Sequence, residues 1–98
     1  MGRYLVLWKM DKSRLPVNPR ERAAGFTPLV AMVKHGMEMG QVRDWGAFTG
    51  EGRGYEVFEG TELELELQIQ QYIPLVDFKV YPLLSLNQIE EMIAAMSS

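Results

Sequence analysis

The sequence contains no cysteine and only one histidine. Without cysteine the chain has no disulfide, no thiolate metal ligand and no cysteine nucleophile. The histidine, His35, falls on the polar side of its predicted helix when the residues are projected at about 100° each, so we expect it at the surface. One exposed histidine is a poor metal or haem ligand set. We therefore expect neither a metal nor a cofactor.

Long apolar runs and an excess of positive charge are also missing. No run approaches the roughly 18 residues of a membrane span, and Leu5–Trp8 is too short for the core of a signal peptide. Lys and Arg number 10 against 13 Asp and Glu, a net charge of -3, which argues against nucleic acid. We expect a soluble, cytoplasmic protein that binds neither nucleic acid nor membrane.

The charges that are present are unevenly distributed. Residues 1–22 hold six basic and two acidic residues, a net charge of +4, and the remaining four basic and eleven acidic residues give -7. One interpretation is complementary surface charge, for example between subunits. The other is a basic loop beside a pocket for an anionic ligand.

A predicted β-hairpin over residues 42–60 lies at the centre of the chain. Val42–Thr49 and Gly54–Glu59 have the aromatic and β-branched content of strands. Between them, residues 50–54 read GEGRG, which is typical of a hairpin loop longer than two residues. A third predicted strand, Arg3–Met10, is apolar on both faces, so both faces should be covered: one by helices, the other most simply by a second subunit.

The remaining elements complete a β-α-β-β-α-β order. Arg20–Gly40 predicts a helix that kinks or restarts at Pro28, because proline lacks an N–H group. Thr61–Tyr72 alternates like a strand, but its composition and its capping box favour a helix. Val76–Leu83 predicts the fourth strand, and Ser85–Met96 an amphipathic helix. We predict a single ferredoxin-like α+β domain over residues 1–98, with an antiparallel sheet and an extra C-terminal helix.

The second half of the chain resembles muconolactone isomerase-like proteins. Gly50-Glu51, Tyr55 and Phe58 match a G-E-x-x-x-Y-x-x-F hairpin, and residues 74–83, PLVDFKVYPL, match the last strand of that family. The likeness covers roughly residues 45–84, and the first half agrees only in element order. The motif W-G-x-F-x-G-E-x-x-G-Y, residues 45–55, is also similar to that of a group of small uncharacterised proteins.

The resemblance implies a dimeric α/β barrel, a homodimer in which two open sheet faces meet and each subunit keeps a cleft between its sheet and its helices. The superfamily includes isomerases, cofactor-free monooxygenases, haem-binding enzymes and members without known activity. The fold alone therefore does not determine the chemistry.

Several residues are candidates for a site in that cleft. Its position in the family pattern makes Glu51 a general base and Tyr55 a hydrogen-bond donor, although a glutamate at a hairpin tip is also consistent with a solvated turn. Trp8 and Trp45 either line the cleft or fill the core or the dimer barrel. Asp77 either positions a polar ligand or joins a cross-strand ion pair. A carboxylate anchor is expected from Arg14, Arg20 or Arg22.

Two function classes follow. The first is a small-molecule-binding protein or a muconolactone isomerase-like enzyme, which acts by proton transfer on an anionic cyclic or aromatic metabolite. The second is a non-catalytic binding or assembly protein that keeps the fold and lacks the active site. Whether the first half of the chain gives the cleft convergent polar groups would separate the two classes, and the sequence leaves both open.

Overall fold

A computed structural model describes residues 2–98 of the chain and contains one four-stranded antiparallel sheet. Its strands are β1 (Gly2–Met10), β2 (Val42–Phe48), β3 (Arg53–Gly60) and β4 (Val76–Leu83). They lie in the order β2-β3-β1-β4, so β1 pairs with both β3 and β4. This is the ferredoxin-like arrangement, and it confirms the predicted fold class.

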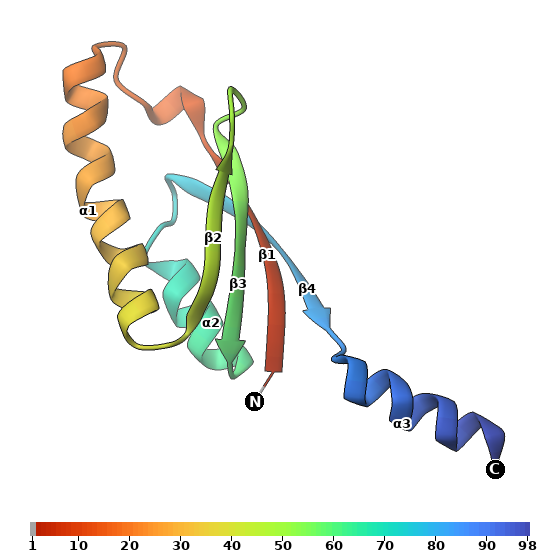
Figure 1. Cartoon of the computed structure of the whole chain (residues 1–98). Coiled ribbons are helices and arrows are strands. Elements are labelled where there is room, and N and C mark those ends of the chain that lie inside the picture. The colour runs from red at the N-terminus through yellow and green to blue at the C-terminus, as the bar shows by residue number, and fades with distance from the viewer. Residues whose placement is uncertain (1) are drawn as a thin grey trace.

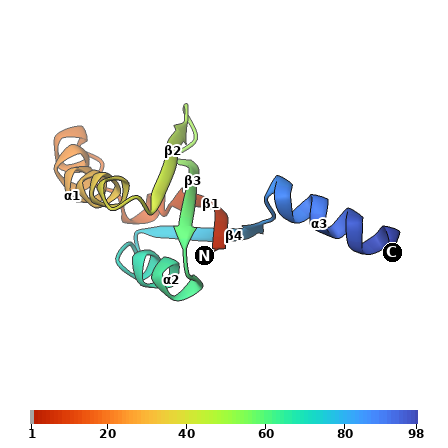
Figure 2. The same ribbon diagram turned by 60° about the horizontal axis from the view of Figure 1, so that its bottom comes forward.

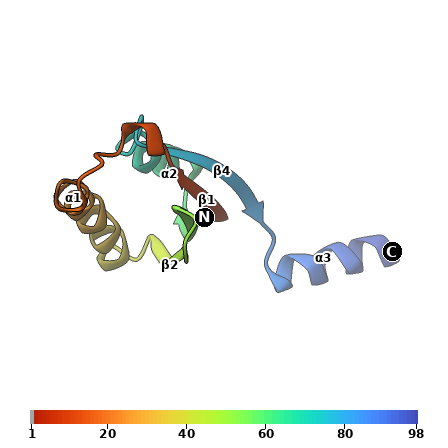
Figure 3. The same ribbon diagram turned by 90° about the horizontal axis from the view of Figure 1, so that it is seen from above.

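Two helices lie on one side of the sheet and a third leaves the body of the molecule. Helices α1 (Pro19–Glu38) and α2 (Glu62–Gln70) lie on the same side (Figures 1 and 2). A short 3-10 turn, η1 (Lys12–Arg14), precedes α1. Helix α3 (Leu86–Ser97) extends beyond the end of β4, as Figure 3 shows from above. The other side of the sheet, which we call the open face, is covered by no helix in these views.

Each α-helix begins at a side chain that caps its first turn. The Asn18 side chain accepts hydrogen bonds from the first backbone N–H groups of α1, and Pro19 occupies the first helical position, where it loses no helical bond. A capping box formed by Thr61 and Glu64 begins α2, and Ser85 begins α3 in the same way. The helical prediction for residues 61–72 is confirmed because local capping outweighs the alternating leucines.

Of the kink or restart predicted at Pro28, the restart is wrong. Helix α1 runs without interruption through Pro28, and Thr27 does not cap a second helix. Instead, the Thr27 hydroxyl donates to the carbonyl oxygen of Ala23 one turn earlier, at 3.0 Å. The Arg22 guanidinium donates to the carbonyl oxygens of Pro16 and Val17 and holds the preceding loop against the helix.

A β-bulge near the start of β2 changes which side chains face the helices. Val42 pairs with Phe58, but the next pair is Asp44 with Val57, so Arg43 is an extra residue. If Arg43 were an ordinary strand residue with its own partner, alternation would place Asp44 on the helix side with Val42. The bulge instead turns Asp44 to the open face and Trp45 toward the helices.

The core lies between the sheet and α2 rather than α1. It contains Tyr4 and Val6 of β1, Phe58 of β3, and Leu65 and Ile69 of α2. By contrast, α1 has no buried residue although it lies over the same face of the sheet. Side chains of α1 therefore border a space above the sheet that the core does not fill.

Candidate functional site

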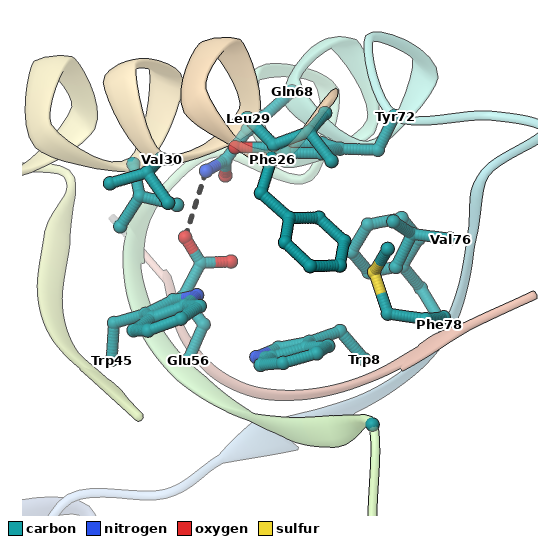
Figure 4. A pocket seen from close by; sticks show the side chains of 13 residues that line it. Trp8, Phe26, Leu29, Val30, Trp45, Glu56, Gln68, Tyr72, Val76 and Phe78 are labelled. Carbon is teal, nitrogen blue, oxygen red and sulfur yellow. Dashed lines mark hydrogen bonds between the residues drawn. The ribbon is translucent and has the colours of Figure 1, made fainter. Parts of the chain in front are cut away.

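A cavity of about 280 Å³ lies between the sheet, α1 and α2 (Figure 4). Most of its surface is apolar, and it continues the core where α1 stands away from the sheet. The apolar wall includes Met10, Phe26, Leu29, Val30, Val76 and Phe78. Apolar concave sites with a few polar groups are typical of small-molecule binding.

Two stacked indoles form one wall of the cavity. The rings of Trp8 and Trp45 are 5.3 Å apart between centroids and 7° from parallel. The Trp8 indole N–H donates to the carbonyl oxygen of Tyr55 at 3.3 Å, which fixes the ring orientation. Gly54, the β3 neighbour of Trp8, leaves room for the indole, because a Cβ there would lie 2.5 Å from Trp8 Cζ2. The result is a flat aromatic surface facing α1.

A buried carboxyl group provides the main polar feature of the cavity. Glu56 of β3 is only 5% exposed, and its Oε1 accepts a 2.8 Å hydrogen bond from Gln68 Nε2 on α2. Burial raises the pKa of the Glu56 carboxyl, and the Gln68 hydrogen bond offsets part of that rise. No lysine, arginine or histidine among residues 2–98 lines the cavity. The carboxyl group therefore has no cation to stabilise its charged form.

Two further polar groups lie beside Glu56. The Gln68 Oε1 atom is buried and has no hydrogen-bond partner. Tyr72, which follows α2, is buried, and its ring makes an edge contact with Phe78. Burial, and secondarily the charge of Glu56, raises the pKa of Tyr72 to about 12. Glu56, Gln68 and Tyr72 thus converge on one cavity from β3, from α2 and from the turn that follows α2.

The structure brings some of the sequence-predicted residues to this cavity and leaves others away from it. Trp8 and Trp45 line it. Glu51 is half-exposed at the hairpin tip, 3.8 Å from Arg53 in an ion pair. Tyr55 lies on the open face, where its hydroxyl donates to Asp44 at 2.9 Å, and that hydrogen bond raises the pKa of Tyr55. The catalytic roles of Glu51 and Tyr55 stay predictions, but neither residue lines the cavity.

The predicted carboxylate anchors also lie elsewhere. Arg14 pairs with Asp11 at 3.2 Å, Arg20 is exposed in the first turn of α1, and Arg22 binds the loop before it. Asp77 is exposed and borders a second, open hollow together with Arg14 and Asp11. None of these four predicted ligand-binding residues lines the apolar cavity.

Sequence reasoning missed Glu56, Gln68 and Tyr72. A signal for Glu56 was present, because Phe58 faces the core and alternation along β3 then places Glu56 on the same side. No comparable signal marks Gln68, whose position depends on how α2 packs on the sheet.

No group of three or more His, Asp or Glu side chains within residues 2–98 is placed to hold a metal ion. His35 is exposed on α1. None of the helices within the same residues has the length and apolarity needed to cross a membrane.

Together, the fold and the cavity define a ferredoxin-like α+β protein with a mostly apolar internal site that contains a buried carboxyl group. No protein-family model matches the chain, and no curated protein matches it significantly.

Proposed function

We propose that this protein binds a small, planar, mainly apolar organic molecule in the cavity between the sheet and α1. The stacked indoles of Trp8 and Trp45 carry this proposal, because they give the cavity a flat aromatic wall suited to a ring system. The volume of about 280 Å³ is near the lower end, roughly 300 Å³, of the usual range for ligand pockets. The ligand is therefore small, of the order of one or two fused rings.

The chemistry of the cavity favours an uncharged ligand over the anionic metabolite expected from the sequence. An anion would need a cation or several donors, and the three predicted arginine anchors lie outside the cavity. An anion beside Glu56 would also raise the cost of ionising that carboxyl group. We therefore propose that the ligand enters the cavity in a neutral form.

Proton transfer is the second candidate function, and Glu56 is the observation that favours it. A buried carboxylate with a raised pKa is a better base near neutral pH than an exposed one. In such a reaction on a β,γ-unsaturated carbonyl compound, Glu56 would remove a proton from the α carbon, and the electron pair would move onto the carbonyl oxygen to give a dienolate. As the carbonyl group reforms, the γ carbon would take the proton back from Glu56, which moves the C=C bond into conjugation with the carbonyl group. Without such a step the protein acts as a non-catalytic binder.

We further propose a homodimer that pairs two open faces as a dimeric α/β barrel. Leu5, Leu7 and Val57 on this face are only half-buried, and Tyr81 and Leu83 are exposed. Helix α3 adds an exposed apolar stripe that its own chain leaves uncovered, formed by Leu86, Met92, Ile93 and Met96. Burying both surfaces against a second copy would remove this apolar area from water.

Ligand binding can be tested without added labels, because Trp8 and Trp45 are the two tryptophans of the chain and both line the cavity. A panel of neutral cyclic ketones and lactones, each with a matched carboxylate, is titrated while tryptophan emission and melting temperature are recorded. We expect saturable changes with neutral members. A ligand at 100 times its Kd adds about 2.7 kcal/mol to the free energy of unfolding. No response to any member would contradict the proposal.

Catalysis is tested separately by deuterium incorporation from D₂O into a bound ketone, followed by NMR. Loss of exchange in Glu56→Gln but not in Glu51→Gln would support Glu56 as the base. Loss of exchange in Glu51→Gln but not in Glu56→Gln would support Glu51 as the base, as the family resemblance implies.

A further inference from the structure

Two polar atoms on residues that line the cavity make no hydrogen bond within residues 2–98. Glu56 Oε1 is engaged by Gln68 Nε2, but the second carboxyl oxygen points toward the space between Phe26 and Trp8 (Figure 4). Gln68 also lines the cavity, and its Oε1 is buried with no hydrogen-bond partner. Buried polar groups are nearly always hydrogen-bonded, so this unpaired carbonyl oxygen is suited to a donor supplied from outside the chain.

The two available atoms have complementary hydrogen-bonding character. When Glu56 is an uncharged acid, its Oε1 accepts from Gln68, and the proton on its second oxygen can be donated into the cavity. Gln68 Oε1 can only accept. The wall therefore offers one donor and one acceptor side by side, held by a single 2.8 Å hydrogen bond between β3 and α2.

We propose that the ligand carries a neutral donor–acceptor pair of the lactam type, with its N–H group donating to Gln68 Oε1 and its carbonyl oxygen accepting from the Glu56 acid. This inference rests on the proposed ligand-binding function and specifies the class of ligand. A planar lactam satisfies both polar atoms while its ring lies against the indoles. A lactone of the same shape lacks the N–H donor and leaves Gln68 Oε1 unpaired. Because an unpaired buried polar atom costs free energy, the lactone should bind much more weakly than the lactam.

The proposal also implies a pH dependence that belongs to Glu56. Among residues 2–98, Tyr72 is the one other titratable side chain that lines the cavity, and its pKa is raised to about 12. The facing residues of β1, β2 and α1, which include Trp8, Trp45 and Phe26, do not titrate. Burial raises the Glu56 pKa, so lactam affinity should decline as pH rises through that pKa and the donor proton is lost.

The test compares 2-quinolone with coumarin by isothermal titration calorimetry, since these flat bicyclic molecules differ only by N–H against ring oxygen. At pH 4, below the ordinary pKa of a glutamate carboxyl group, we expect the protein to bind 2-quinolone at least tenfold more tightly than coumarin. The affinity for 2-quinolone should be smaller at pH 9. Gln68→Met should reduce the ratio to near one. Glu56→Gln keeps an N–H donor and should keep the preference without the pH dependence.

The possible outcomes distinguish a failure of the lactam assignment from a failure of the proposed ligand-binding function. Equal affinity for the two compounds would overturn the lactam assignment and leave ligand binding intact. If neither compound binds and tryptophan emission does not change, both the lactam assignment and the proposed binding of flat bicyclic ligands are overturned. Because the comparison uses the unmodified protein, it does not depend on whether a variant folds.

Discussion

The Trp8 and Trp45 indoles stack above β3, although their own strands are not neighbours in the sheet. β3 separates β2 from β1, and Gly54 of β3 lies beneath the Trp8 ring with no side chain to hold the two indoles apart. The aromatic wall of the cavity therefore depends on a glycine in the middle of the sheet as much as on the two tryptophans.

The first prediction concerns that glycine. In Gly54→Ala the new methyl group would overlap the Gly46 carbonyl oxygen and lie 2.5 Å from Trp8 Cζ2. Overpacking of this kind costs about 1–3 kcal/mol. We expect a lower urea midpoint and a changed near-UV circular dichroism signal from the indoles. The matched control is Gly25→Ala in α1, where nothing lies within 4 Å and a gain of about 0.5–1 kcal/mol is expected. Equal effects of the two substitutions would contradict this account.

The second prediction concerns the aromatic wall. Trp45→Leu keeps an apolar side chain on β2 but removes the flat surface. Aromatic pairs contribute about 0.5–1.5 kcal/mol beyond the area they bury, so we expect the Kd of a planar ligand to rise by up to about tenfold in calorimetry. Phe48→Leu, on the opposite face of the same strand, should leave the Kd unchanged. A larger effect from Phe48→Leu would place the ligand on the open face instead.

The third prediction concerns stability against pH. Burial raises the pKa of Glu56 in the folded state above 4.5, its ordinary value, so the folded protein binds the proton more tightly than the unfolded chain does. This contribution to stability is full below pH 4.5 and is lost as pH rises through the folded-state pKa. Glu56→Gln should remove that loss, so wild type and variant should diverge above pH 4.5 in thermal melts. Glu51 is exposed, so the melting temperature of Glu51→Gln should depend on pH as that of the wild type does.

The fourth prediction concerns assembly. Leu7 lies at the centre of the open face, on β1, and Leu7→Glu would place a charge in the proposed interface. In sedimentation experiments the wild type should behave as a dimer and the variant as a monomer. Val17→Glu, at a side chain 92% exposed in the loop before α1, is the control and should stay dimeric. A monomeric wild type would remove the basis for the dimer proposal.

Much of the fold follows from local sequence signals. Caps at Asn18, Thr61 and Ser85 determine where the helices begin, and glycines form the hairpin turn, with Gly50 and Gly52 at φ of 81° and 65°. These features involve residues near one another in the chain. The composition of each segment was therefore enough to predict the strand and helix order.

The cavity was harder to predict because it depends on contacts between distant segments. Sequence reasoning included Trp8 and Trp45 among the candidates but could not show that they stack, because the Arg43 bulge has no clear local signature. The carboxyl group at the cavity is Glu56, whereas the family pattern directed attention to Glu51. Alternation along β3 places Glu56 on the same side as Gly54 and Phe58. A glutamate is nevertheless expected in contact with water, and its burial follows only once the position of α2 above it is known.

The bulge at Arg43 is the one place in β2 where the chain length can change without exchanging the two faces of the strand. Val42 pairs with Phe58 and Asp44 with Val57, so Arg43 occupies no position of its own in the ladder. Deleting Arg43 would leave Val42 and Asp44 as ordinary alternating neighbours, with Asp44 still on the open face and Trp45 still facing the cavity. A deletion within residues 44–48 would instead exchange the faces of the residues beyond it. Homologous chains that keep the cavity should therefore tolerate a change of length at position 43 but not in the rest of the strand.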